Sequence, residues 1–240
     1  MGIPGRSSGT FEGSDAGSTE ILRGQTPAIH FFQSFRRRQT MNYTGPKVRL
    51  SRRLGVAITP KAAKYLERKP NPPGQHGPNM RRKKLSDFGK QLLEKQRLRF
   101  QYNVSERQLR IVYEQAKRKL GNTGEMMVQM LETRLDAFIL RAGFARTIYA
   151  ARQYVRHGHI TVNGRRVDLP SYRIRPQDVV AVRQRSRRLE CFRDALAGTV
   201  PPSYIDLSKP EMKARLLHIP ERDEIPVICN VPLVVEYYSR

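Results

Sequence analysis

Positively charged side chains cluster within residues 134–178, where the pattern predicts two helices followed by a tight hairpin. Arg152 and Arg156 lie four residues apart, so on a helix they share one flank. The cluster consists of Arg152, Arg156, His157, His159, Arg165, Arg166 and Arg173. Arginine can pair with phosphate oxygens through two parallel hydrogen bonds, and a rigid group of such side chains suits a phosphate backbone. The segment is therefore a candidate nucleic-acid interface.

The helix that carries Arg152 and Arg156 has recognisable start and stop signals. Thr147 can act as its N-cap, because the hydroxyl can accept a hydrogen bond from a first-turn N–H. An apolar stripe at helical spacing follows, formed by Ile148, Ala151 and Val155. Gly158 is placed to end the helix in a left-handed cap.

The hairpin after this helix is predicted from alternation and from its turn. Residues 159–162 alternate like a strand, and Asn163-Gly164 is a strong signal for a two-residue turn. Residues 165–167 then begin the return strand. Helix and hairpin together would hold the cations on one rigid frame.

The charge of the chain is unevenly distributed. The sequence holds 45 Lys and Arg residues against 21 Asp and Glu residues, a formal net charge of +24. Residues 41–102 contain 16 basic and 3 acidic side chains, residues 134–188 contain 13 and 3, and residues 200–240 contain 5 and 6. Such an excess indicates a polyanionic partner, and its location favours two binding segments over a merely soluble basic surface. The near-neutral last segment is better suited to packing or to protein contact.

Several classes of site are not supported by the sequence. The two cysteines, Cys191 and Cys229, are far apart and form neither a disulfide framework nor a metal-ligand spacing. No apolar run approaches the length of a membrane span. We therefore expect no metal, no cofactor, no catalytic residues and no membrane partner.

The rest of the chain is read from caps and periodicity. Residues 42–79 are poor in regular pattern, apart from a short helix at 60–68 capped by Thr59. Ser86 and Ser105 are N-cap candidates for two longer helices, and a further helix should begin near Thr123. Later elements are predicted as a strand at 179–182, a short helix at 189–196, and strands at 203–207, 215–219 and 233–238.

These residues resemble a known family. The stretches ARQYVRHGHITVNGRRV (151–167) and LPSYRIRPQD (169–178) resemble the alpha-L RNA-binding motif. That motif also occurs as a portable module, so its flanks decide between families. The flanks resemble the bacterial-type family of the fourth protein of the small ribosomal subunit, through LSRRLG (50–55), PPGQHG (72–77), LSDFGKQLLEKQ (85–96), SERQLR (105–110), GNTGE (121–125) and VEYYSR (235–240).

The resemblance implies an α+β fold, with a helical N-terminal domain and an alpha-L RNA-binding domain whose helices pack on a small antiparallel sheet. Four segments are expected. Residues 1–40 would be a disordered extension, with Met41 as a candidate true start. Residues 41–131 would form the basic helical domain, 132–197 the alpha-L domain, and 198–240 a β-rich segment packing back on the body.

The resemblance also implies a structural role in the cytoplasmic ribosome, with an organellar ribosome as the alternative. The protein would bind the 5′ domain of small-subunit rRNA at a multi-helix junction, nucleate assembly, and contribute to translational accuracy and to the mRNA entry channel. Its expected partners are small-subunit rRNA, the fifth small-subunit ribosomal protein and mRNA at the entry channel.

The residues expected to perform these roles form three groups. The rRNA-binding candidates are Lys47, Arg49, Arg52, Arg53, Gln75, His76, Lys95, Arg97, Arg99, Arg152, Arg156, His157, His159, Asn163, Arg165, Arg166, Tyr172 and Arg173. The mRNA-channel candidates are Arg81, Arg82, Lys83 and Lys84. The candidates for a protein interface are Asp206, Glu221 and Glu224.

Two alternatives bear on these expectations. Some members of the family bind zinc through cysteines near the N-terminus, but here Val48 and Ser51 stand where a CxxC pair would begin, which implies a zinc-free member. An RNA-modifying enzyme could also use the alpha-L motif as an accessory. Such an enzyme needs a catalytic domain beside the motif, and the sequence shows no nucleotide-binding glycine loop or paired carboxylates in an apolar setting.

Overall fold

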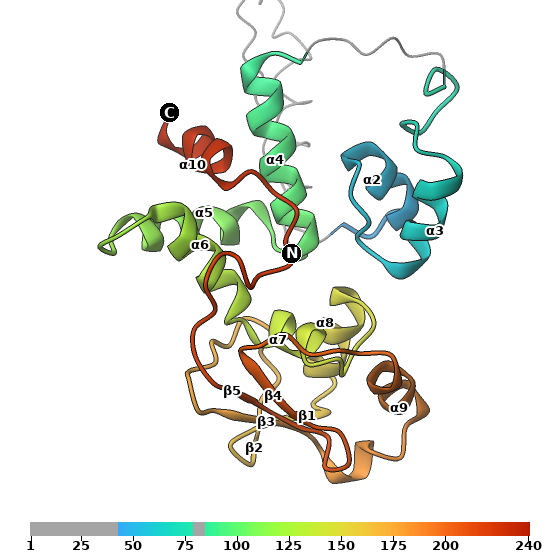
Figure 1. Cartoon of the computed structure of the whole chain (residues 1–240), viewed down its shortest axis with the longest axis vertical. Helices are drawn as coiled ribbons and strands as arrows, with labels where there is room; N and C mark the ends of the chain where they lie inside the picture. Colours follow the sequence, from blue (N-terminus) through green and yellow to red (C-terminus); the bar gives the residue numbers. More distant parts are fainter. Residues whose placement is uncertain (1–42, 79–84) are drawn as a thin grey trace, which may run out of the picture. The chain divides into compact units, whose positions relative to one another are not determined.

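The computed structural model describes residues 43–78 and 85–240 (Figure 1). The helices in these ranges are α2 (Lys47–Leu54), α3 (Pro60–Arg68), α4 (Asp87–Gln101), α5 (Glu106–Lys117), α6 (Thr123–Glu132), α7 (Leu135–Arg141), α8 (Ile148–Arg156), α9 (Glu190–Ala197) and α10 (Val231–Ser239). The strands are β1 (Ile160–Val162), β2 (Arg165–Arg166), β3 (Val179–Val182), β4 (Ile205–Ser208) and β5 (Lys213–Leu216). The predicted α+β fold is confirmed.

The first hydrophobic core is built from α4, α5, α6 and α10 and is called the first core below. Its buried side chains include Leu98, Leu109 and Leu131, together with Val234 of α10. The N-caps predicted from the sequence hold: the Ser86 hydroxyl accepts from Gly89 N, and Ser105 forms a reciprocal capping box with Gln108. Helix α10 packs against α4 and α6, so a C-terminal segment completes a core that begins near residue 98.

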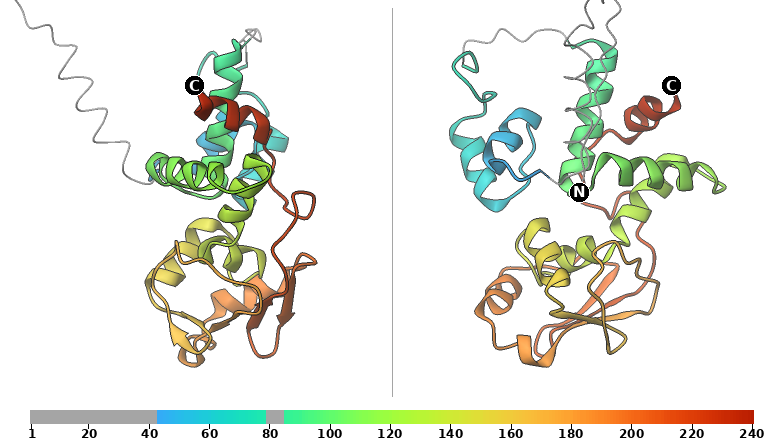
Figure 2. Two further views of the ribbon diagram at one scale, coloured as in Figure 1. Left: turned by 90° about the vertical axis from the view of Figure 1, so that its left-hand side faces the viewer. Right: turned by 180° about the vertical axis from the view of Figure 1, so that it is seen from behind.

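The second core lies between α7, α8, α9 and an antiparallel sheet of order β2-β1-β3-β5-β4 (Figure 2). Phe138, Phe144 and Phe192 are buried in it. The predicted hairpin is confirmed: Thr161 pairs with Arg166 across β1 and β2, and the turn uses positive φ at Asn163 (49°) and Gly164 (81°). The Asn163 amide also donates to Asp178 Oδ1 and its oxygen accepts from Val179 N, which ties the turn to β3.

Two predictions about secondary structure were wrong. Residues 233–238 lie in helix α10, although their valines and tyrosines favour strands, because burial of Val231 and Val234 outweighs local propensity and Pro232 suits a first turn. Helix α2 forms in a stretch that shows little regular pattern. Leu50 and Leu54 supply its buried face, and Gly55 caps it at φ 69°.

Residues 198–240, predicted as a β-rich segment that packs back on the body, contribute to both cores. Strands β4 and β5 extend the sheet of the second core, through pairing of β3 with β5, while α10 belongs to the first core. The predicted extension 1–40 and the basic run Arg81–Lys84 lie outside the described residues. No helix within residues 43–78 and 85–240 is long and apolar enough to cross a membrane.

Candidate RNA interface

The end of α8 and the hairpin present the exposed cations of the second core. Thr147 caps α8 as predicted, its hydroxyl accepting from Ala150 N at 3.2 Å. Arg156, Arg165 and Arg166 are exposed. A helix end and a two-residue turn fix the backbone that carries them, so only side-chain freedom remains to be lost when they meet phosphates.

Gly158 lets the hairpin lie close to the end of α8. It adopts φ 71°, and a Cβ at this position would stand 2.2 Å from Arg166 Nε. The Arg166 guanidinium therefore rests on the bare backbone of Gly158, beside the exposed imidazole of His157. Glycine suits the left-handed backbone here, and a Cβ would push the Arg166 guanidinium away from its present position.

His159 occupies a more enclosed position than the other cluster members. Its Nδ1 lies 2.9 Å from Ser186 Oγ. Burial lowers the pKa of His159 below its ordinary value, and the charges of His157, Arg166 and Arg183 lower it further. A neutral His159 thus acts as a spacer and hydrogen-bonding group in a crowded cationic patch.

Three exposed arginines next to this patch were not among the predicted site residues. Arg183, Arg185 and Arg188 follow β3, in the loop that leads to α9. The backbone N–H of Arg183 donates to the carbonyl oxygen of His159 at 2.8 Å, and the charge of Arg183 contributes to the lowered pKa of that imidazole. Their clustering in the sequence was the available signal, and the pairing of β3 with β1 explains why they adjoin the α8 end.

Arg152 does not share the exposed position of Arg156. Its Nη1 lies 3.5 Å from Asp136 Oδ2 and 3.4 Å from the carbonyl oxygen of Asn103. Burial lowers the pKa of the Arg152 guanidinium, while Asp136 opposes that effect. Arg152 thereby links α8 to the turn after α4, and its phosphate contact stays a prediction.

The predicted contacts of α4 are also used within the protein. Lys95 is buried, forms an ion pair with Glu106 at 3.1 Å and lies over the Tyr237 ring, so these contacts within the protein compete with its predicted role in rRNA binding. Arg97 donates to the carbonyl of Leu54 and pairs with Glu94. Arg99 donates to the carbonyl of Val104 at 3.2 Å. These side chains hold α4 against its neighbours.

Of the rRNA-binding candidates on α2 and in the loop after α3, some are exposed and others make contacts within the protein. Arg49 and Arg53 are exposed, as are Gln75 and His76 in the loop after α3. Arg52 donates to the carbonyl oxygens of Asn71 and Pro72 at 3.0 and 3.2 Å, and so anchors that loop to α2. Lys47 lies over the rings of Tyr43 and Tyr149, at 4.8 and 4.3 Å from their centroids.

The loop before β3 contributes two further candidates. Tyr172 and Arg173 are both exposed, and Arg173 donates to the side-chain oxygen of Gln115 on α5. This loop also pairs with the end of α6, because Ile174 N donates to the carbonyl of Thr133 at 2.8 Å. Arg173 therefore lies where the second core adjoins α5.

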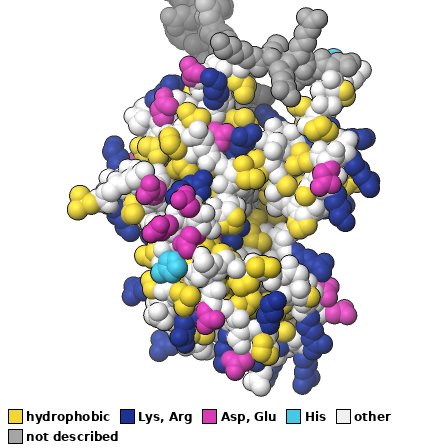
Figure 3. Space-filling view, viewed as in Figure 1, with side chains coloured by type: hydrophobic (Ala, Val, Ile, Leu, Met, Phe, Trp, Pro, Cys, Tyr) yellow, Lys and Arg dark blue, Asp and Glu magenta, His cyan; other side chains and the backbone are white. Residues whose placement is uncertain are grey.

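The acidic candidates for a protein interface are not equivalent. Asp206 on β4 and Glu221 are exposed. Glu224 accepts from Ser203 Oγ at 2.6 Å and from Glu221 N at 3.0 Å, and pairs with His218. These hydrogen bonds, that of Ser203 first, lower the pKa of Glu224. On the face shown in Figure 3, acidic side chains gather at the left, while basic ones lie along the edges.

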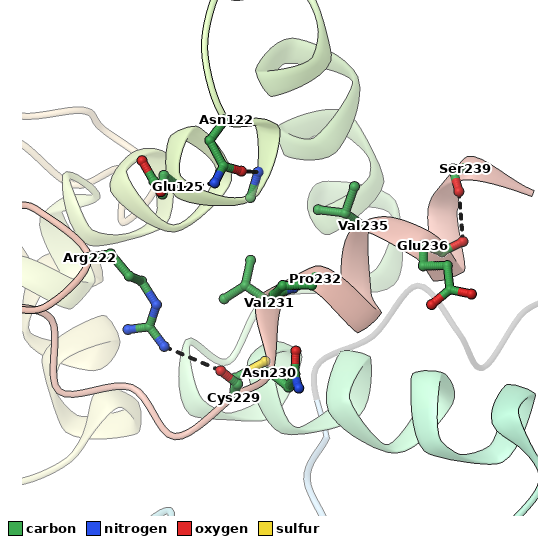
Figure 4. A pocket seen from close by; sticks show the side chains of 11 residues that line it. Asn122, Glu125, Arg222, Cys229, Asn230, Val231, Pro232, Val235, Glu236 and Ser239 are labelled. Atoms are coloured by element: carbon green, nitrogen blue, oxygen red, sulfur yellow. Dashed lines mark hydrogen bonds between the residues drawn. The ribbon is translucent and has the colours of Figure 1, made fainter.

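A cleft of about 730 Å³ between α6 and α10 offers no catalytic constellation (Figure 4). Arg222 in its wall donates hydrogen bonds to the carbonyl oxygens of Ile225, Val227 and Cys229. Burial raises the pKa of the Cys229 thiol to about 12, so it is not a ready nucleophile. Among the described residues, no group of three or more His, Cys, Asp or Glu side chains could hold a metal ion.

The fold and this interface agree with the matches to known families. A model for the ribosomal protein S4/S9 N-terminal domain matches residues 42–132, and a model for the S4 domain matches residues 133–180. The small ribosomal subunit protein uS4 of Streptomyces avermitilis is 54% identical over 204 residues, which cover 83% of this chain and 99% of the relative. The chain belongs to the uS4 family.

Two further relatives support the assignment. The uS4 protein of Thermobifida fusca is 50% identical over 204 residues, covering 83% of this chain and 100% of the relative. That of Micrococcus luteus is 51% identical over 199 residues, covering 80% and 95%. This uS4 protein is therefore a small-subunit ribosomal protein that binds rRNA, and it is a structural component rather than an enzyme.

Alanine substitutions at two glycines should separate backbone strain from loss of the interface. Gly158 and Gly164 both have positive φ, but a Cβ meets Arg166 only at Gly158. We expect each variant to lose about 1–2 kcal/mol of unfolding free energy in urea, the cost of a left-handed alanine. Only Gly158→Ala should weaken binding to small-subunit rRNA, by about fivefold for one displaced arginine. Equal affinities of the two variants would contradict the role given to Gly158.

Proposed function

We propose that this uS4 protein binds the 5′ domain of small-subunit rRNA at a multi-helix junction and nucleates assembly of the subunit in the bacterial cytoplasm. The observation that carries the proposal is the rigid patch of Arg156, Arg165 and Arg166 on a capped helix and hairpin. A-form RNA hides its base edges in a deep groove, so such a patch reads shape, phosphates and 2′-hydroxyls. Fixing several RNA helices at set angles requires no catalysis.

A salt titration of rRNA binding tests this patch. Arg156→Ala and Arg166→Ala should each reduce the slope of log K against log salt by roughly 0.7–0.9, because one fewer phosphate is neutralised. Arg152→Ala is the matched control, since that side chain is held by Asp136 and Asn103. On a single-helix rRNA fragment it should leave the slope unchanged, and it should lower the free energy of unfolding by roughly 1–2 kcal/mol. Unchanged slopes for Arg156 and Arg166 would make the patch ordinary solvated surface.

We further propose that the surface carrying Asp206, Glu221 and Glu224 contacts the fifth small-subunit ribosomal protein. This contact would influence translational accuracy. The fall in charge over residues 200–240 and the exposure of Asp206 and Glu221 support this assignment. A surface that differs in sign from the rRNA-binding patch suits a basic protein partner.

Charge reversal tests the protein contact. Asp206→Lys with Glu221→Lys should alter misreading in a reporter assay while subunits still assemble, because only exposed charges change. Glu224→Lys is expected to behave differently, since it removes an acceptor from Ser203 and Glu221 N and should lower thermal stability. Normal accuracy in the Asp206 and Glu221 double variant would discard the contact.

The basic run Arg81–Lys84 is proposed to line the mRNA entry channel and to disfavour re-pairing of structured messages. A cationic ring can grip single-stranded phosphates, and gripping one strand opposes duplex formation. The competing proposal is that the four residues bind only rRNA and matter for assembly.

Translation through a stable hairpin distinguishes the two roles. With all four residues changed to alanine, the channel role predicts assembled subunits that slow more on a hairpin-containing message than on an unstructured one. The physical reason is that the opened strand would no longer be held. Equal slowing on both messages, or failure to assemble, would favour the assembly role.

A further inference from the structure

The buried carboxylate of Glu132 connects the two cores. Glu132 is the last residue of α6, and its side chain is 1% exposed. The carboxylate accepts hydrogen bonds from the hydroxyl of Tyr102, from the hydroxyl of Tyr204 at 2.8 Å and from Arg141 Nε. Tyr102 belongs to the first core and Tyr204 to the second. One side chain therefore ties the end of α4 to the segment that enters β4.

Asp136 makes a second tie to the same place. Its carboxylate, also 1% exposed, binds Arg134 through two hydrogen bonds of 3.0 and 2.8 Å. It also pairs with Arg152, which donates to the carbonyl of Asn103. Asn103 directly follows Tyr102, so both acids reach one turn at the end of α4.

Polar contacts of this kind fix geometry more than they add stability. Burying a charge costs free energy, and an apolar replacement of similar volume is often as stable. Hydrogen bonds to a carboxylate are directional, whereas apolar contacts allow surfaces to slide. Burial raises the pKa of both Tyr102 and Tyr204, and the charge of Glu132 raises it further. Both hydroxyls are therefore donors at neutral pH.

We propose that Tyr102, Glu132 and Tyr204, called the clamp, are positioning residues that make the protein selective for RNA in which helices meet at an angle. The clamp holds α4 and its neighbours at one fixed orientation to the helix and hairpin. The inference rests on the proposed function, because it concerns recognition of the same rRNA.

The physical basis is the orientation of two cationic surfaces. Arg107 and Arg110 are exposed on α5 of the first core, while Arg156 and Arg166 are exposed on the second. When one surface has bound an RNA helix, the effective concentration of the other depends on how rigidly the two are joined. If the two cores are joined loosely, the effective concentration of the second surface falls, and binding of a junction RNA weakens. A single RNA helix occupies only one surface, so its binding is unaffected.

The test compares two RNAs in binding titrations at one salt concentration. One is a 5′-domain rRNA fragment that contains a multi-helix junction, and the other is a hairpin made from one of its arms. Tyr102→Phe with Tyr204→Phe removes both hydroxyls and keeps both rings. If the clamped orientation falls to about a tenth of the population, affinity for the junction falls about tenfold, while hairpin affinity changes less than about twofold.

Tyr238→Phe is the matched control. The Tyr238 hydroxyl donates to Glu106 Oε1 at 2.7 Å, which joins α10 to α5 within the first core. It removes the same kind of hydrogen bond without crossing between the cores, so the ratio of junction to hairpin affinity should stay at the wild-type value. An equal loss on both RNAs, no loss on either, or the same change in Tyr238→Phe would overturn the clamp.

A distance measurement keeps this result separate from the proposed function. Spin labels on the exposed Cys191 of α9 and on Lys90→Cys of α4, in a Cys229→Ser background, report the orientation of the cores without RNA. The distance distribution should broaden in the Tyr102→Phe, Tyr204→Phe variant and not in Tyr238→Phe. Equal widths would overturn the clamp. Wild-type protein that binds junction and hairpin equally would instead overturn the proposed function.

Discussion

The need to give a buried guanidinium a hydrogen-bond acceptor shapes the part of the protein that the structure describes. Basic side chains outnumber acidic ones by 45 to 21, so acids available for burial are scarce. Glu94, Glu132 and Asp136 are buried, and each holds arginine: Arg97, Arg141, and the pair Arg134 and Arg152. Arg52 and Arg222, which have no carboxylate partner, are half-buried and donate to backbone carbonyl oxygens instead. An unpaired buried charge would be too costly, so arginines such as Arg156 and Arg166 stay exposed. The cationic surface therefore consists largely of basic side chains that have no buried partner inside the described part of the protein.

That division determines what each core can do. In the second core, Thr147, Gly158 and the Asn163-Gly164 turn fix the backbone from which the exposed Arg156 and Arg166 project. In the first core, Lys95, Arg97 and Arg99 make contacts within the protein. The first core adds rigidity and the exposed Arg107 and Arg110, while the second core presents Arg156 and Arg166 from a fixed backbone.

Local signals were sufficient wherever a short-range physical rule applies. The caps at Ser86, Ser105 and Thr147, and the hairpin turn, depend on neighbouring backbone groups and were predicted correctly. Helix α10 was mistaken for a strand because its conformation is decided by burial against α4, far away in sequence. The family and the α8–hairpin patch could be inferred from the sequence, because their residues are contiguous.

Which candidate cations are free could not be inferred in the same way. Arg152 and Arg156 look alike on a helical flank, yet only Arg152 has Asp136 and Asn103 beside it. Asp136 lies 16 residues before Arg152 and Asn103 lies 49 residues before it. Such pairings depend on tertiary packing, which the periodicity of a sequence does not reveal.

The route of the chain through the two cores has a consequence for how the protein is made. The chain leaves the first core after α6, completes the whole sheet from β1 to β5, and only then returns with α10. During synthesis the second core can close as soon as β5 has emerged, while α4, α5 and α6 still lack the helix that covers them. A nascent chain would thus form its helix–hairpin patch before the first core is complete. Contact with RNA at that stage would be made by half of the recognition surface, and the other half would dock afterwards.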